Sequence, residues 1–98
     1  MMAQYIAQSP NIACRLLGGE MIVISTESSE LFTLDEIATA IWSAADGRTP
    51  LREIVERRVC AEYEVDLETA LRDTEELVRG LAAHGILLTS NQPFPEAA

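Results

Sequence analysis

The sequence predicts an α+β fold in which a three-stranded antiparallel sheet is followed by three helices. From residue 12 to residue 33, apolar residues occur in short runs bounded by turn residues, as is typical of strands. From residue 34 onward they recur at intervals of three and four, as in helices that bury one face. Because strands and helices occupy separate parts of the chain, we expect the helices to cover one face of the sheet.

The first two strands are predicted to form a hairpin. Residues 12–17 and 21–24 are largely apolar, and the second run is rich in β-branched side chains, which favour strands. Gly18 and Gly19 lie between the two runs, and two consecutive glycines supply the positive φ angles of a two-residue hairpin turn.

A third, shorter strand is predicted at residues 30–33, after a second polar turn. Side chains of a strand alternate between its two faces, so Leu31 and Thr33 share one face while Glu30 and Phe32 share the other. One of these pairs faces the core and the other faces outward. The segment contains no proline, so its backbone groups are free to pair with a further strand.

The first helix is predicted to begin near residue 35 and to end at Asp46-Gly47. Either Thr33, in a capping box with Glu36, or Asp35 can accept a hydrogen bond from its first turn. The apolar face of this helix consists of Ile37, Ala38, Ile41, Trp42 and Ala45. We assign Trp42 to the core, because a tryptophan at helical spacing in a small domain usually packs at its centre.

The second and third helices also have clear start and end signals. Thr49 can cap the second helix, and Pro50 suits its first turn, where a missing N–H costs nothing. Asp66 is expected to cap the third helix and Gly85 to end it, before a short apolar segment at residues 86–89. The apolar face of the second helix is Leu51, Ile54, Val55, Val59 and Tyr63, and that of the third is Leu67, Ala70, Leu71, Thr74, Leu77, Val78 and Leu81.

The chain is predicted to form one domain, because 98 residues suffice for a single modest core. We expect this domain to span residues 12–89, with flexible tails at residues 1–11 and 90–98, and to act as a free-standing module. No apolar run reaches the roughly 18 residues of a membrane span, and residues 1–11 lack the features of a secretory signal. We therefore expect a cytoplasmic protein that has no membrane partner.

The charge of the chain disfavours nucleic acid as a partner. Sixteen Asp and Glu residues against seven Lys and Arg residues give a formal net charge of −9 at pH 7. The second and third helices could form a helix-turn-helix, and strands beside such a pair make a winged helix-turn-helix, an arrangement found in DNA-binding proteins. On the third helix, however, acidic residues outnumber arginines, so this helix would repel phosphates.

No catalytic or cofactor-binding motif is recognised in the sequence. The single histidine, His84, falls in the last turn of the third helix, where its interaction with the helix dipole accounts for it. Cys14 and Cys60 have neither the spacing of metal ligands nor that of a disulfide framework. No glycine-rich phosphate loop follows a strand. We therefore expect a protein that is not an enzyme and that holds no cofactor and no metal.

Several short motifs follow one another along most of the chain. They are residues 34–49 (LDEIATAIWSAADGRT), Glu53-Ile54-Val55, Tyr63 with Val65, Asp73, Leu77, Leu81 and Gly85-Ile86-Leu87. In this order they resemble the PqqD-like family, and the resemblance covers roughly residues 12–88. Asp35 stands where that family usually has Asn, a change that preserves helix capping.

The resemblance implies a winged-helix-like domain that recognises peptides in pathways of ribosomally made, post-translationally modified peptides. Such domains bind the leader segment of the precursor peptide and serve pathways such as pyrroloquinoline quinone and lasso-peptide biosynthesis. The resemblance implies that the leader adds as a strand to the third predicted strand, at Glu30, Leu31, Phe32 and Thr33. It further implies a partner enzyme, either a modifying enzyme of the radical SAM type or a leader peptidase.

On the third helix, Leu71, Thr74, Glu75 and Val78 are the expected contacts of the peptide, because spacings of three and four align them on one flank. Leu71 and Val78 also fit the core stripe, so a packing role is the alternative for both. Two other functions remain open: a winged-helix DNA-binding regulator, and a purely structural subunit of a larger enzyme.

Overall fold

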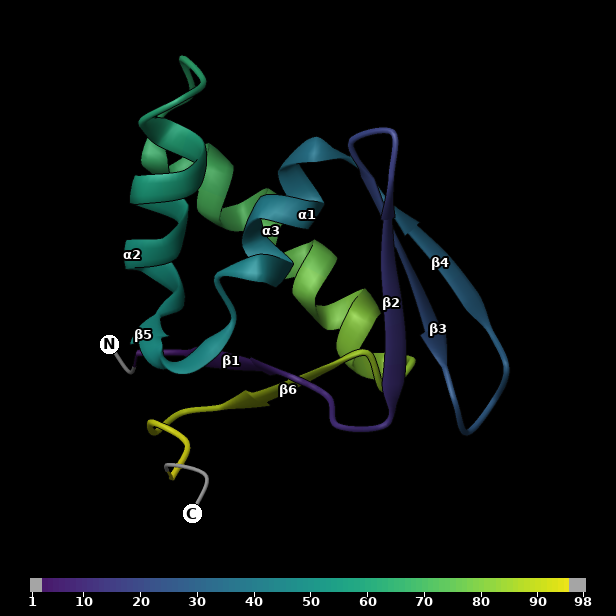
Figure 1. The fold of residues 1–98 in the computed structure, drawn as a ribbon. Helices are drawn as coiled ribbons and strands as arrows, with labels where there is room; N and C mark the ends of the chain where they lie inside the picture. The colour runs from purple at the N-terminus through teal and green to yellow at the C-terminus, as the bar shows by residue number, and fades with distance from the viewer. Residues whose placement is uncertain (1–2, 96–98) are drawn as a thin grey trace.

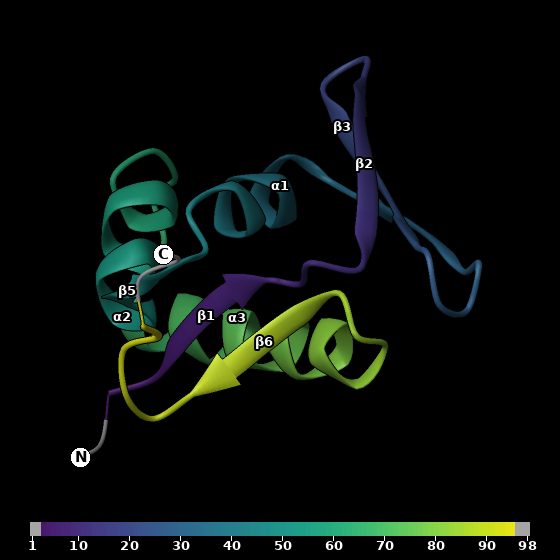
Figure 2. The same ribbon diagram turned by 60° about the horizontal axis from the view of Figure 1, so that its bottom comes forward.

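The computed structural model describes residues 3–95 of the chain. Its elements in chain order are β1 (Tyr5–Gln8), β2 (Ile12–Leu17), β3 (Glu20–Ser25), β4 (Leu31–Leu34), α1 (Glu36–Ser43), β5 (Asp46–Pro50), α2 (Leu51–Val55), η1 (Glu56–Cys60), α3 (Leu67–Ala83) and β6 (Leu87–Ser90). Here η1 is a π-helical turn that continues α2. The strands form two three-stranded sheets, β2-β3-β4 and β5-β1-β6, with the helices packed beside them (Figures 1 and 2).

The predicted fold class is confirmed, because β2, β3 and β4 form the expected antiparallel meander and three helical segments follow it. Gly18 and Gly19 make the hairpin turn with φ angles of 59° and 87°, and Leu17 pairs with Glu20 across it. Strand β4 begins and ends one residue later than predicted. This meander stands to one side of the molecule, with the tip of the β2–β3 hairpin projecting away from the helices (Figure 2).

The second sheet corrects the predicted domain boundary. Residues 1–11 were expected to be a flexible tail, but residues 5–8 form β1, the central strand of the β5-β1-β6 sheet, and Ile6 is completely buried. Tyr5 pairs with Ser90 on one side and with Pro50 on the other. These partners lie far away in the sequence, so the short apolar run at residues 5–7 gave no local sign of a strand.

One core joins the two sheets to the helices. Helix α1 packs against β3 and β4, while α3 packs against α2, η1 and β6. Trp42 is buried in this core, which confirms its assignment, and its indole Nε1 has no hydrogen-bond partner among the described residues. The fully buried side chains of largest volume are Ile6, Ile41, Leu51, Ile54, Ile86, Leu87, Val23, Val55 and Val78.

Aspartates cap two of the helices. Asp35, rather than Thr33, caps α1: its Oδ1 accepts a hydrogen bond from the Ala38 N–H at 2.8 Å. Asp66 caps α3 as predicted, accepting from the Thr69 N–H at 3.0 Å, and this bond lowers the pKa of the Asp66 carboxyl. Thr49 does not cap α2, because the residue preceding that helix is Pro50 and makes no side-chain cap.

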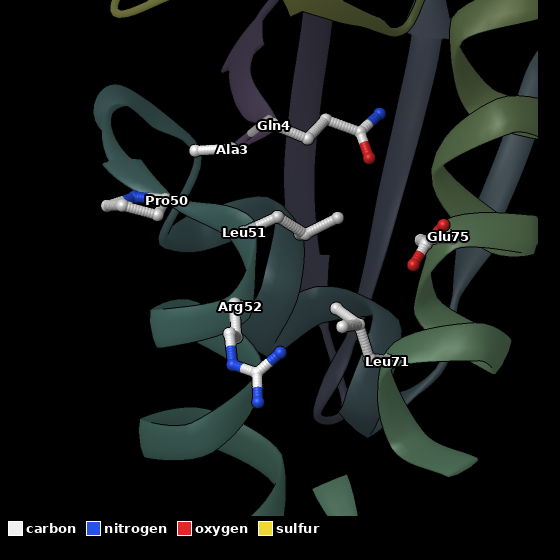
Figure 3. Close-up of a pocket in the computed structure, with 7 residues that line it drawn as sticks. All are labelled: Ala3, Gln4, Pro50, Leu51, Arg52, Leu71 and Glu75. Atoms are coloured by element: carbon white, nitrogen blue, oxygen red, sulfur yellow. The ribbon is translucent and has the colours of Figure 1, made fainter. Parts of the chain in front are cut away.

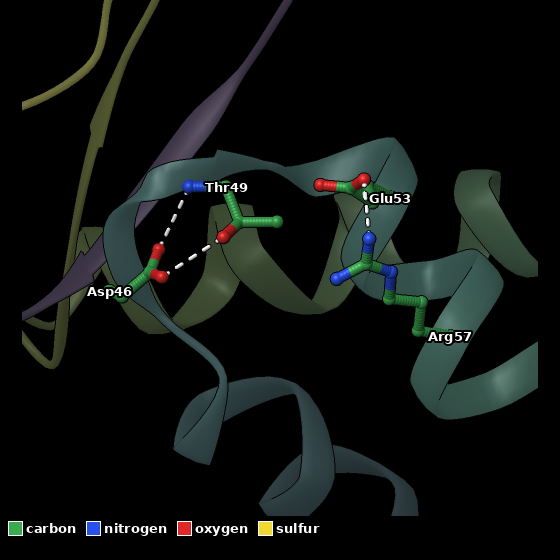
Figure 4. A network of polar contacts seen from close by, with 4 residues as sticks. All are labelled: Asp46, Thr49, Glu53 and Arg57. Atoms are coloured by element: carbon green, nitrogen blue, oxygen red, sulfur yellow. Dashed lines mark hydrogen bonds and ion pairs between the residues drawn. The ribbon is translucent and has the colours of Figure 1, made fainter.

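Asp46 organises the turn that leads from α1 into β5. Its Oδ1 accepts from the N–H groups of Arg48 at 2.9 Å and Thr49 at 2.8 Å, and its Oδ2 accepts from Thr49 Oγ1 at 2.9 Å. Figure 4 shows this turn together with the ion pair of Glu53 and Arg57, at 2.9 Å on the neighbouring helical turn. The hydrogen bonds from Arg48 and Thr49 hold the pKa of Asp46 below its ordinary value of 3.8.

The same turn fastens the C-terminal segment to the domain. The Phe94 N–H donates to the Gly47 carbonyl at 2.8 Å, and the Phe94 side chain is half-buried. Gly47 has a φ of 75°, and a Cβ at this position would lie 2.9 Å from the Phe94 Cβ. Residues 90–95 therefore contact the domain, although residues 90–98 were expected to be a flexible tail; residues 96–98 lie outside the described chain.

We predict that Gly47→Ala lowers the free energy of unfolding by at least about 2 kcal/mol, because the new methyl group meets Phe94 and the backbone is left-handed. Gly85→Ala is the matched control: its φ is 74° but nothing lies near a Cβ there, so it should cost about 1 kcal/mol. Chemical denaturation of both variants measures the difference. An equal loss of unfolding free energy in the two variants would show that the contact with Phe94 does not affect stability.

Asp46 should make stability depend on acid pH. Its pKa is lowered in the folded state, so its stabilisation is complete above the ordinary value of 3.8 and is lost as the pH falls through the folded-state pKa. Thermal unfolding from pH 7 down to pH 2 should show a smaller acid-induced loss for Asp46→Asn than for the unmodified chain. Asp73→Asn, which removes one exposed carboxylate from α3, is the control for charge alone. An identical effect in the two variants would contradict the role of Asp46.

Candidate functional site

The outer edge of β4 lies at the predicted site and is unpaired in the described structure. Strand β4 pairs with β3 on one side, and among the described residues no strand pairs with its other side (Figure 1). The Ser25 N–H donates to the Glu30 carbonyl at 2.9 Å, so this carbonyl points toward β3. Because this direction alternates along an antiparallel strand, the N–H and C=O groups of Leu31 and Thr33 point to the open edge.

The structure also determines which side of β4 faces the core. Leu34 is buried and Phe32 is half-buried against the core, so these two side chains point inward. Leu31 is 58% exposed and Thr33 is also exposed, so this pair points outward. An inward Phe32 beside an open backbone edge provides an aromatic surface that a further strand could cover.

Helix α3 approaches β4 at its C-terminal turn. The ring of His84, the residue that follows α3, lies 4.9 Å from the ring of Phe32, measured between centroids. His84 Nδ1 also lies 3.6 Å from Glu30 Oε2. His84 was expected only to interact with the end of its own helix, and no pattern in the sequence indicates its contact with the predicted binding strand. These three residues form a small corner at one end of the open edge, which we call the His84 corner.

The predicted α3 contacts do not gather at this edge. Thr74 and Val78 are 4% and 1% exposed, which places both side chains inside the core and corrects their assignment to a peptide-binding surface. Leu71 and Glu75 are half-buried and line a pocket of about 470 Å³ with residues from the N-terminal segment and α2 (Figure 3). The other lining residues are Ala3, Gln4, Pro50, Leu51 and Arg52.

The geometry of a helix explains why Leu71 and Glu75 lie away from the β4 edge, whereas His84 lies beside it. Each residue advances about 100° around the helix axis, so Leu71 and Glu75 lie on one flank of the buried stripe. Leu77 and His84 lie on the opposite flank, and the contact with Phe32 shows that this second flank faces β4. The apolar spacing of α3 identifies the buried stripe, but it does not reveal which flank will meet the sheet.

Among residues 3–95, no three His, Cys, Asp or Glu side chains come together in a group that could hold a metal ion. Within the same residues, no helix combines the length and the apolar character needed to cross a membrane.

Comparisons with known proteins support the resemblance seen in the motifs. A family model described as coenzyme PQQ synthesis protein D (PqqD) matches residues 20–87. A solved structure described as "TbiB1 in Complex with the TbiA(beta) Leader Peptide" superposes with a TM-score of 0.75 and shares 30% sequence identity. The match covers 83% of this chain and 93% of TbiB1. A search of curated proteins gives no significant match. Since the family match spans more than half of the sequence, the chain belongs to the PqqD family.

Proposed function

We propose that the protein binds the leader segment of a ribosomally made precursor peptide by strand addition at β4 and presents it to another enzyme. The open edge of β4 is the observation that carries this proposal. Membership of the PqqD family and the likeness to TbiB1, whose structure contains a leader peptide, support it. The protein itself acts as a cytoplasmic, non-catalytic chaperone that needs no cofactor.

The backbone of β4 supplies four hydrogen-bonding groups to the peptide, the N–H and C=O of Leu31 and of Thr33. Four bonds at about 0.5 to 1.5 kcal/mol each, with two or three buried side chains at about 1.5 to 3 kcal/mol each, oppose an association cost of about 4 to 15 kcal/mol. Micromolar or tighter binding is therefore attainable. The peptide's inward side chains cover Phe32 and meet α3 at the His84 corner, rather than at Leu71 and Glu75.

Presentation of the leader needs no chemistry by this protein. While the leader is held on a carrier that docks on an enzyme, the rest of the precursor meets the active site at a raised effective concentration. We expect this enzyme to be a modifying enzyme of the radical SAM type or a leader peptidase. The net charge of −9 favours a basic patch on the surface that receives the carrier.

The DNA-binding alternative is weaker in the folded structure. Glu68, Asp73 and Glu76 on α3 are all exposed, so the helix that would enter the major groove presents carboxylates to the phosphates. A gel shift at low salt tests this alternative directly. A purely structural subunit would instead co-purify with a larger enzyme and show no affinity for peptide on its own.

We predict that Thr33→Pro weakens leader binding at least tenfold, because proline removes an N–H that points to the open edge but makes no bond to β3. Isothermal titration with a synthetic peptide that covers the leader of the precursor encoded beside the gene measures the change. Phe32→Pro is the contrasting variant. Its N–H points toward β3, so the substitution should lower the thermal unfolding midpoint, whereas Thr33→Pro should nearly preserve it. Unchanged binding by folded Thr33→Pro would exclude β4 as the binding strand.

His84→Ala and Glu75→Ala distinguish the two flanks of α3. We expect His84→Ala to weaken binding of the same peptide about threefold to tenfold, because it removes the ring that supports Phe32 at the edge. Glu75→Ala should leave the affinity within twofold, because Glu75 lines the separate pocket (Figure 3). A larger loss of affinity in Glu75→Ala than in His84→Ala would place the peptide between α2 and α3.

A further inference from the structure

The outward face of the β2-β3-β4 sheet is apolar and uncovered in the described structure. Ile24 and Leu31 on this face are 40% and 58% exposed, and Leu17 is 49% exposed near the hairpin tip. A shallow hollow of about 440 Å³ lies over them, lined by Ala13, Cys14, Arg15, Leu17, Ile22, Ile24 and Leu31. An exposed apolar surface of this kind on a chain of net charge −9 is typical of a surface that binds a partner.

The register of the sheet divides this face into rows that run across the strands. In one row, Ala13 of β2 lies opposite Ile24 of β3, which lies opposite Leu31 of β4. We call these three residues the apolar row, since none of them is polar. The row ends at Leu31, whose side chain has a cross-strand neighbour in β3 but, among residues 3–95, none in a strand beyond β4.

The next row has a different character. Arg15 lies opposite Ile22, and Ile22 lies opposite Thr33. We call these residues the mixed row. It also ends at the open edge, with the short hydroxyl side chain of Thr33, which has little apolar surface to bury. A strand added to β4 would therefore meet two different chemical environments on its outward side, two residues apart.

We infer that the peptide carries an apolar side chain where it extends the apolar row beside Leu31, and that it tolerates a polar side chain where it extends the mixed row beside Thr33. This inference rests on the proposed addition of the peptide at β4. The occupant of the apolar row is then the peptide strand itself, because a strand paired with β4 continues every row by one residue. The inward side chain between these two positions lies against Phe32.

The apolar pattern of such a peptide differs from that of an ordinary amphipathic strand. In such a strand only alternate residues are apolar, because one face is in water. Here the position that covers Phe32 and the adjacent outward position beside Leu31 are both apolar. The apolar residues of the peptide are thus consecutive at one point and alternate with polar residues beyond it.

The test uses the full chain and a phage-displayed library of random 12-residue peptides. Peptides that bind are synthesised, and each position is replaced by Ser in turn. Affinities are measured by isothermal titration against the unmodified protein and against Leu31→Ser. Leu17→Ser is the matched control, since it removes a leucine of similar exposure from the same face, two strands away from the open edge.

We expect Leu31→Ser to weaken the selected peptides about fivefold, as loss of one cross-strand apolar contact and its buried area predicts. One Ser substitution in the peptide should remove this effect, which identifies the residue that extends the apolar row. The residue two positions away should accept Ser with less than a twofold change. Leu17→Ser should bind like the unmodified protein.

Three results would overturn the inference, and they differ in what they say of the proposed function. If Thr33→Pro weakens the selected peptides but Leu31→Ser does not, the peptide pairs with β4 without using the apolar row, so the inference fails alone. If no peptide is selected whose binding depends on Thr33, strand addition at β4 fails and the inference fails with it. Equal losses in Leu31→Ser and Leu17→Ser would also overturn it.

Discussion

The abrupt change from β4 to α1 is the constraint on which the rest of the structure depends. Leu34 is the last residue of the strand and is buried, and Asp35 immediately caps the helix by accepting from the Ala38 N–H. With no loop between the two elements, α1 must fold back over the inward face of the sheet, where it packs on β3 and β4. The chain leaves β4 toward the core, so no other described strand pairs with its outer edge.

The parts of the fold that could be predicted are those with local causes. The Gly18-Gly19 turn, the cap at Asp66 and the burial of Trp42 each follow from residues close together in the sequence. The β5-β1-β6 sheet could not be predicted in this way, because β1 pairs with a strand at the other end of the chain. Short strands with distant partners have almost no signal of their own.

The candidate site could likewise be predicted only where its residues have a local signal in the sequence. The two faces of β4 could be predicted from local alternation, but the burial of Leu34 and the packing of Phe32 were needed to show which face points inward. Which α3 residues lie near β4 depends on which flank of the helix faces the sheet, and tertiary packing sets that orientation. Consequently Thr74 and Val78 lie in the core, while His84, whose position had suggested only a helix end, touches the strand.

The central position of β1 also has a consequence for the order in which the domain assembles. The β2-β3-β4 meander needs contacts only within about twenty residues and can form as soon as that segment is available, because nearby segments close small loops. Strand β1 is synthesised earlier but pairs with both β5 and β6, and β6 is the last of the described elements in chain order. A nascent chain therefore carries the β4 edge before the β5-β1-β6 sheet can close.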